Sequence, residues 1–405
     1  MKILLGGIPL GCNNIGDEAI LACVIRIFRQ ARPDAELVGS TRDREGTARK
    51  FGVETVPLYG FERMFPAEHF HRVLKDIDLF VWAGATGLSD YPRMGCTLLR
   101  IARSHGVQTM VWSVGMNDVF NPSFFQLRGK KRTLCGLVRK MTGYDLKRAW
   151  EERMVLAVRR EIARNLGECR LVVLRDWRSL RELRRCAPFP EAVAGADSAV
   201  LQDGVDFEKL PWSAECAGRF NNAAKRLAVC ISEQNPIRQQ REFCEWLDRL
   251  HAARPDLLTV MIPMNLKTDY VLMRELISNL EHPERVMLTN FGEPEEVQAL
   301  VGRCSLVLSS RLHLIILALN CLVPCIGIAR GSKIPFFLDE FGLPCTGSTE
   351  HIDFAALSEM VNYYLDLEGF NEQARPRREK LLADLDGARF LLKQALDALP
   401  GPRGR

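Results

Sequence analysis

The stretch SLVLSSRLHLIILALNCLVPCIGI, residues 305–328, contains two short apolar runs with a longer apolar run between them. Residues 305–308 and 324–328 have the length and composition of strands that are buried on both faces. Residues 312–320 predict a buried helix between these strands. A membrane-spanning helix needs ~20 clean apolar residues, and Asn320 and Pro324 interrupt this stretch. The stretch therefore predicts a strand–helix–strand unit of a parallel sheet.

The same alternation of strands and helices extends in both directions from this unit. We expect further strands at residues 2–6, 36–39, 54–58, 78–83, 107–114, 171–174, 192–194, 227–231, 258–263 and 285–289. Short connections between strands and helices favour parallel sheets with helices on both faces. The polar stretch at residues 211–225 separates the two halves.

These patterns predict an α/β protein of two Rossmann-like domains, similar to the GT-B architecture, with parallel sheets and an intervening cleft. The expected boundaries are 1–210, 211–365 and a helical tail at 366–405. Ligands of such sheets bind near the carboxyl ends of the strands. We therefore expect ligands of both domains to face the cleft.

Composition narrows the functional class. The 405 residues are 47% hydrophobic and 26% charged, which is ordinary for a globular enzyme. The net charge of +5 is too small to indicate nucleic acid. The 13 cysteines lack metal-ligand or redox spacing, which favours free thiols and a cytoplasmic location. Residues 1–10 are interpreted as a first strand and not as a signal peptide. We expect no bound metal and no cofactor.

One segment, residues 128–164 within a helical excursion at 120–165, is strongly basic. It has 12 Lys or Arg residues against 4 Asp or Glu residues. A solvated helical excursion is one interpretation. The other is a patch for anionic lipid headgroups or a lipid-diphosphate carrier, at the inner face of a membrane. Without a recognised binding motif, the charge does not predict nucleic acid as a partner.

Polar residues open the helix that follows the first strand. Glycines there allow tight turns, and the free N–H groups of a helix start favour negative charge. Two acidic residues in this run either stabilise the helix end or face the cleft, where one accepts a proton from a sugar hydroxyl. The spacing is not that of a dinucleotide fingerprint. The candidate binding residues in this run are Asn14, Gly16, Asp17 and Glu18.

Cationic residues follow three other predicted strands. Arg311 and His313 open a helix after residues 305–308, a placement that suits a phosphate or a carboxylate. Lys333 follows the next strand, and Arg175 follows residues 171–174. An ion pair between Arg175 and its neighbour Asp176 is the structural alternative. Together the four cationic groups predict a site for a small, highly charged anion.

These residues carry a resemblance to the polysaccharide pyruvyl transferases. The run NIGDEAIL, residues 14–21, resembles that family's opening motif, and Arg175-Asp176 with Ser179 resembles its Arg-Asp-x-x-Ser element. Asp197 resembles the acidic residue that closes the family's first domain. The most specific match runs from Ser310 through Lys333.

The resemblance implies a two-domain GT-B-like fold and phosphoenolpyruvate (PEP) as the donor. It also implies that the C-terminal domain holds the donor and that the N-terminal domain, with residues 14–18, holds the acceptor. The pyruvyl group would form a cyclic ketal with two hydroxyls of a sugar or lipid-linked glycan, in exopolysaccharide or cell-envelope synthesis. By position, Arg175, His313 and Lys333 match the family's PEP-binding residues, with Arg311 beside them. We assign His313 as the general acid or a phosphate ligand, and Asp17 as the base.

The chain departs from the family pattern on the acceptor side. Residues 115–118 read GMND where the family has Gly-Pro, which makes Asn117 a further acceptor-side candidate. Residues 83–87 read AGATG in place of a run of glycines. Two alternatives therefore stay open. One is a GT-B glycosyltransferase that uses a nucleotide sugar, and the other is a catalytically degenerate family member that binds glycans.

Overall fold

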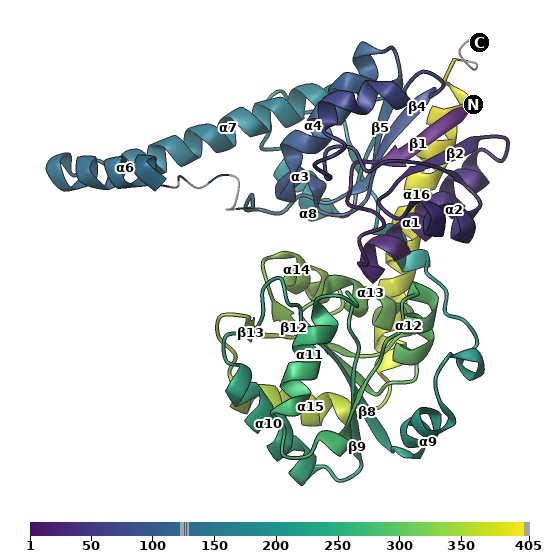
Figure 1. The fold of residues 1–405 in the computed structure, drawn as a ribbon, viewed down its shortest axis with the longest axis vertical. Coiled ribbons are helices and arrows are strands. Elements are labelled where there is room, and N and C mark those ends of the chain that lie inside the picture. Colours follow the sequence, from purple (N-terminus) through teal and green to yellow (C-terminus); the bar gives the residue numbers. More distant parts are fainter. Residues whose placement is uncertain (122–124, 126, 128, 401–405) are drawn as a thin grey trace. The chain divides into compact units, whose positions relative to one another are not determined.

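A computed structural model describes residues 1–121, 125, 127 and 129–400 of the chain. Arg128, one end of the basic segment, and residues 401–405 of the expected tail lie outside this description. The chain forms two compact units (Figure 1). The first unit contains Met1–Cys12, Val24–Asp197 and Asp384–Arg405, and the second contains Asn13–Cys23 and Ser198–Ala383.

Two helices contain a boundary between the units. Helix α1, Ile15–Ala31, changes unit after Cys23, and helix α16, Phe370–Asp397, changes unit after Ala383. The expected division into residues 1–210, 211–365 and 366–405 did not include these two exchanges. The start of α1 therefore belongs with the later part of the sequence.

The first unit is built on a sheet of seven parallel strands in the order β3-β2-β1-β4-β5-β6-β7. The strands are β1 (Lys2–Gly6), β2 (Glu36–Ser40), β3 (Glu54–Val56), β4 (Leu79–Ala83), β5 (Gln108–Val114), β6 (Val172–Leu174) and β7 (Val193–Ala194). Its other helices are α2 (Arg44–Phe51), η1 (Ala67–Val73), α3 (Gly87–Asp90), α4 (Pro92–Ser104), α6 (Gly129–Thr142), α7 (Leu146–Gly167) and α8 (Trp177–Leu183).

The second unit is built on six parallel strands in the order β10-β9-β8-β11-β12-β13. They are β8 (Lys225–Cys230), β9 (Leu257–Met261), β10 (Val286–Leu288), β11 (Leu306–Ser309), β12 (Cys325–Ala329) and β13 (Cys345–Ser348). Its helices are η2 (Ser198–Leu201), η3 (Phe207–Lys209), α9 (Ala214–Asn222), α10 (Gln240–Ala253), α11 (Asp269–Ser278), η4 (Pro283–Arg285), α12 (Pro294–Val301), α13 (Leu312–Asn320), α14 (Lys333–Asp339) and α15 (Phe354–Leu365).

Both sheets reverse their strand order once. In the first unit β1 pairs with β2 on one side and β4 on the other, and in the second unit β8 lies between β9 and β11. The two loops that follow the strands at such a reversal leave in opposite directions and open a crevice between them. The sheets therefore place a natural binding position after β1 and β4, and another after β8 and β11.

Large aromatic side chains fill the core on both faces of the first sheet. Trp82 on β4 lies beside Val111 of β5, so Trp82 and Trp112 point to opposite faces. Phe28 of α1 meets the ring of Trp112 edge to face at 6.0 Å, and Gly95 of α4 lies against Trp82. Helices therefore cover both faces, as expected for strands that are apolar along their whole length.

Helices α6 and α7 form an arm that projects from the first unit (Figure 1). Asp145 begins α7, and its carboxylate accepts a hydrogen bond from the backbone N–H of Arg148 at 3.0 Å. The last turns of α7 are buried through Val158, Ile162 and Leu166 and pack against α4. The start of α7 and most of α6 are exposed.

The α/β class and the two parallel sheets that the sequence predicted are confirmed. The sequence did not indicate β13, whose residues CTGS lack an apolar run. Among the described residues, no helix combines the length and apolar character that are needed to cross a membrane.

Candidate functional site

The candidate site of the second unit is built around the strand reversal between β8 and β11. Ser232 follows β8, and its backbone N–H donates to the hydroxyl of Ser310 after β11, at 2.9 Å. Both side chains are fully buried. The hydroxyl of Ser310 therefore joins the two loops that form the crevice and does not cap α13.

Arg311 is held by a buried carboxylate. Its Nε and Nη2 donate to the two oxygens of Asp269 at 3.0 and 2.7 Å. Asp269 is fully buried, and its Oδ1 also accepts the backbone N–H of Glu233 at 3.0 Å. The paired hydrogen bonds fix the guanidinium plane. A buried charge also needs such a partner, because water no longer solvates it.

His313 lies against the start of α1. A Cβ atom placed on Gly16 would overlap the imidazole ring of His313. Gly16 is therefore the residue that lets the first turn of α1 approach α13 this closely. Both residues belong to the second unit, so the contact lies within one compact body.

Backbone pairing explains why the start of α1 belongs to this unit. The backbone N–H of Ile15 donates to the carbonyl of Met264 at 3.0 Å, and Asn14 forms a β-bridge with Asn265. The loop after β9 thus holds residues that the sequence assigned to the N-terminal domain. Asn14, Gly16, Asp17 and Glu18 consequently lie in the same unit as the expected donor residues.

Asp17 is the buried acid of the cluster, with 7% of its surface exposed. Burial is the largest influence on the pKa of its carboxyl and raises that pKa above the ordinary value. The charge of His313 and a 2.7 Å hydrogen bond from the Asn14 amide lower the pKa by smaller amounts. Arg311 and Lys333 also lower it. Asp17 thus lies in the combined field of the three predicted cationic residues of this unit.

The loop after β12 completes the cationic side of the cluster. Arg330 Nη1 donates to the hydroxyl of Ser232, and Lys333 begins α14. Gly331 between them has a φ of +154°, a backbone conformation that disfavours residues with a Cβ atom. Lys333 thus follows the strand next to β11 and lies close enough to Asp17 to lower the pKa of that carboxyl.

Arg175 occupies a similar position in the first unit, directly after β6. It is 8% exposed, and its Nε donates to Asp176 at 3.2 Å. Burial acts to lower the pKa of Arg175, but three nearby carboxylates outweigh burial and raise it. These carboxylates belong to Asp176, Asp197 and Asp90. A Cβ on Gly115 would overlap the guanidinium, so Gly115 leaves the space in which Arg175 lies.

The predicted residues therefore fall into two groups. Asn14, Gly16, Asp17, Glu18, Arg311, His313 and Lys333 gather in the second unit, whereas Arg175 and Asn117 belong to the first. Glu18 is half-buried in the first turn of α1, and the backbone N–H of Asn117 donates to the Ser89 hydroxyl at 3.1 Å. Sequence reasoning gave no role to Ser232 or Arg330 and missed Asp269. Ser232 and Arg330 carried no signal beyond their positions after strands, and Asp269 is the first residue of α11.

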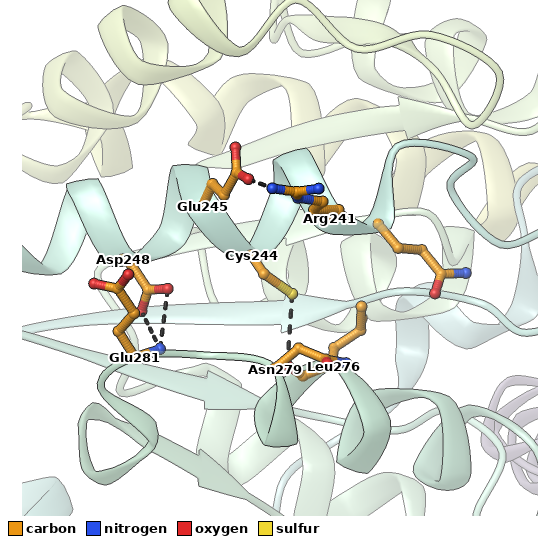
Figure 2. A pocket seen from close by; sticks show the side chains of 8 residues that line it. Arg241, Cys244, Glu245, Asp248, Leu276, Asn279 and Glu281 are labelled. Carbon is orange, nitrogen blue, oxygen red and sulfur yellow. Dashed lines mark hydrogen bonds and ion pairs between the residues drawn. The ribbon is translucent and has the colours of Figure 1, made fainter.

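A separate cavity of about 530 Å³ lies between α10 and α11 of the second unit (Figure 2). Its polar groups bond to one another. Arg241 pairs with Glu245 at 2.9 Å, and Asp248 accepts the backbone N–H of Glu281 at 3.1 Å. The candidate site residues do not line this cavity. Among the described residues, no group of His, Cys, Asp and Glu is arranged to hold a metal ion.

Comparison with known proteins gives three results. Residues 14–332 match the family model of polysaccharide pyruvyl transferases. No curated protein matches the sequence. Several solved structures share its fold.

The S. aureus MnaA protein in complex with UDP aligns with a TM-score of 0.64 and 12% identity over 100% of both chains. The Anabaena Alr3699/HepE protein with UDP and glucose gives a TM-score of 0.60 and 14% identity, over 97% of this chain and 100% of that chain. The glycotransferase of kitacinnamycin gives a TM-score of 0.59 and 14% identity, over 98% of this chain and 99% of that chain. At these identities the likeness shows the fold alone, which is that of GT-B glycosyltransferases and epimerases.

Proposed function

We propose that this chain, which belongs to the polysaccharide pyruvyl transferase family, transfers the pyruvyl group of PEP to two hydroxyls of one sugar. The product is a cyclic ketal, and the second product is inorganic phosphate. The acceptor is a sugar unit of an exopolysaccharide or cell-envelope glycan, free or lipid-linked. Sugar substrates also agree with the fold, since two structures of similar fold contain UDP or glucose.

The observation that carries this proposal is the cluster around Asp17. A buried carboxyl with a raised pKa lies in the field of His313, Arg311 and Lys333. PEP has a carboxylate and a phosphate, which need cationic groups, and its reaction needs a proton donor and a proton acceptor. Cations beside the start of α13 also add to the positive end of that helix dipole. The residues around Asp17 include a candidate for each of these three kinds of group.

The reaction needs two proton transfers that these residues can perform. His313 gives a proton to the methylene carbon of PEP, which becomes a methyl group and leaves a cation-like centre at C2. A sugar hydroxyl bonds to C2 and loses its proton to Asp17. The C2–O bond to phosphate breaks, phosphate leaves with its electron pair, and the second hydroxyl closes the ketal. The second hydroxyl loses its proton to the departing phosphate.

Lys333 and Arg311 have different tasks in this proposal. Lys333 is a compact point charge and binds the phosphate of PEP. Arg311 gives two nitrogens to Asp269, so it acts mainly as a fixed charge that orients the site. Arg175 is proposed to bind the PEP carboxylate. A raised pKa makes Asp17 a better proton acceptor near neutral pH than an ordinary carboxylate is.

Turnover with labelled donor tests this function. The chain is incubated with PEP labelled with ¹³C at C2 and with a panel of free and lipid-linked sugars. Carbon NMR follows the ketal carbon, and a colorimetric assay follows phosphate. We expect the ketal and phosphate to appear in equal amounts with at least one acceptor, and His313→Ala to lower kcat by about 10²–10⁴-fold.

Parallel reactions with UDP-sugars distinguish the alternatives. Release of UDP from a nucleotide sugar, with PEP unchanged across the panel, would replace the proposed function by glycosyl transfer. Glycan binding without turnover of either donor would indicate a degenerate member. Gln240→Ala, which alters the distant cavity of Figure 2, is the matched control and should keep full turnover.

A further inference from the structure

Helix α6 of the arm exposes an apolar stripe. Leu134, Leu137 and Met141 are separated by three and four residues, so they lie on one face of the helix. They are 60%, 53% and 84% exposed, and Tyr144 just beyond the helix is 60% exposed. Single exposed apolar residues are common, but an aligned stripe of them marks an interaction surface.

The side of α6 next to the stripe already has a partner. Cys135 is buried and Val138 is half-buried, and α6 packs against α7. Lys131 Nζ lies 5.8 Å from the centre of the Trp150 ring of α7, a cation–π contact that joins the two helices. The stripe of Leu134, Leu137 and Met141 therefore lies outside the contact between α6 and α7.

Cations are exposed on the other faces of α6. They are Lys131, Arg132, Arg139 and Lys140. The few carboxylates of the segment are each within 4.0 Å of a cation, in the pairs Arg139–Asp145, Lys147–Glu151, Arg148–Glu152 and Arg93–Glu161. The excess of basic residues, 12 against 4 over residues 128–164, thus gives this arm a strongly positive surface.

We infer that the stripe of α6 docks on the headgroup region of a membrane rich in anionic lipids, with Leu134, Leu137 and Met141 inserted and the exposed cations of α6 on lipid phosphates. An amphipathic helix with a basic polar face lies in the plane of such an interface. Each basic residue near an anionic bilayer adds to the attraction. A free anion would make no use of the apolar stripe, and a second copy would bring one positively charged arm against another.

Vesicle binding tests the inference with the full chain and without PEP or sugar, so its failure leaves the transferase proposal untouched. Sedimentation is measured with vesicles of phosphatidylcholine alone and of phosphatidylcholine with an equal part of phosphatidylglycerol. We expect binding to the anionic vesicles, with weaker binding at high salt. Equal binding to both vesicles, or binding to neither, would overturn the inference.

Substitutions locate the contact. The triple variant Leu134→Ser, Leu137→Ser, Met141→Ser should weaken binding by on the order of tenfold or more, because it removes the inserted side chains. Met64→Ser is the matched control, because Met64 is 83% exposed on the same unit. It should bind as the wild type does. An equal loss in both variants would contradict the assignment of the stripe.

A second pair of variants tests the charge. Arg132→Gln with Lys140→Gln should weaken binding to anionic vesicles severalfold and reduce its dependence on salt. Arg44→Gln with Arg49→Gln, exposed on α2 of the same unit, should change neither. Circular dichroism confirms that each variant is folded. If the triple variant instead dissociates a dimer and leaves vesicle binding unchanged, the stripe is an interface between copies of this chain and the inference is wrong.

Discussion

Arg175 in the first unit and Arg311 in the second differ in how firmly carboxylates hold them. Arg175 directly follows β6, and Arg311 is the second residue after β11. Each is 8% exposed. Arg311 donates twice to the fully buried Asp269, at 3.0 and 2.7 Å. Arg175 donates through Nε to Asp176, at 3.2 Å, and the Asp176 side chain is 26% exposed. The same residue type at similar burial is thus firmly fixed in one unit and more loosely held in the other.

The difference indicates that the two arginines have different roles. A cation that shares two hydrogen bonds with a buried carboxylate has little capacity left for a ligand, and its removal leaves a buried charge unpaired. A cation whose hydrogen-bonded carboxylate is partly solvated, as Asp176 is, can exchange that partner for a ligand at lower cost. We therefore expect loss of Arg311 to affect stability most, and loss of Arg175 to affect PEP binding most.

Replacing Arg311 with Ala should have the largest effect. It leaves Asp269 buried without its cation, so we expect the free energy of unfolding to fall by about 3–5 kcal/mol in urea titrations. The double variant Arg311→Met, Asp269→Leu removes both charges and should recover most of that loss. A loss in Arg311→Ala below about 1 kcal/mol would contradict the inference that Arg311 is held more firmly than Arg175.

Replacing Arg175 with Ala should weaken PEP binding by about tenfold to a hundredfold, because a charge-assisted hydrogen bond to the ligand is lost. Stability should fall by less than in Arg311→Ala, since Asp176 retains solvent. Calorimetry and urea titration of the same preparation measure both quantities. Unchanged affinity for PEP would remove Arg175 from the site.

Two glycines allow a matched test of the positions that they support. Gly16→Ala pushes against His313, and Gly115→Ala pushes against Arg175. Each should cost about 1–3 kcal/mol through overpacking. We expect Gly16→Ala to lower kcat more than it changes PEP affinity, and Gly115→Ala to do the reverse. The same kinetic change in both variants would show that the two cationic residues do not have separate roles.

Asp17→Asn should produce the smallest change in the free energy of unfolding, and the size of this change depends on pH. Because the pKa of Asp17 is raised in the folded protein, the folded state holds this proton more tightly than the unfolded state does. Wild-type stability therefore falls as pH rises from the ordinary carboxyl range, about 4, through the raised pKa. The Asn variant lacks this loss, so it should be more stable than the wild type at pH 7 and gain little at pH 3.5. A variant that is less stable at pH 7 would contradict the dominance of burial over the surrounding cations.

Much of the fold follows from local sequence. Buried parallel strands are apolar along their whole length, so runs such as residues 78–83 identify β4 and its neighbours without an alignment. The order of the strands and the reversal at β8 and β11 depend on long-range pairing, which no local pattern records. β13 has no apolar run, because only Thr346 of its four residues is buried.

The site was predictable where its residues follow strands and unpredictable where they meet across loops. The sequence singled out Arg311, His313 and Lys333 as candidates because the ends of parallel strands share one edge of a sheet. Asp269 was missed because its role comes from folding, which buries it against Arg311. The start of α1 was assigned to the N-terminal domain by its position in the chain, whereas the bond from Ile15 to Met264 holds it in the second unit.

PEP binding through His313 and Lys333 is tested most directly by calorimetry. PEP is titrated into the wild type, His313→Ala and Lys333→Ala, with UDP as the control ligand. Binding of a small anion needs no acceptor, so the measurement does not depend on the identity of the sugar. We predict that PEP binds the wild type, that each variant weakens this binding by at least about tenfold, and that UDP does not compete. Tight binding of UDP without binding of PEP, or equal PEP affinity in all three proteins, would contradict this prediction.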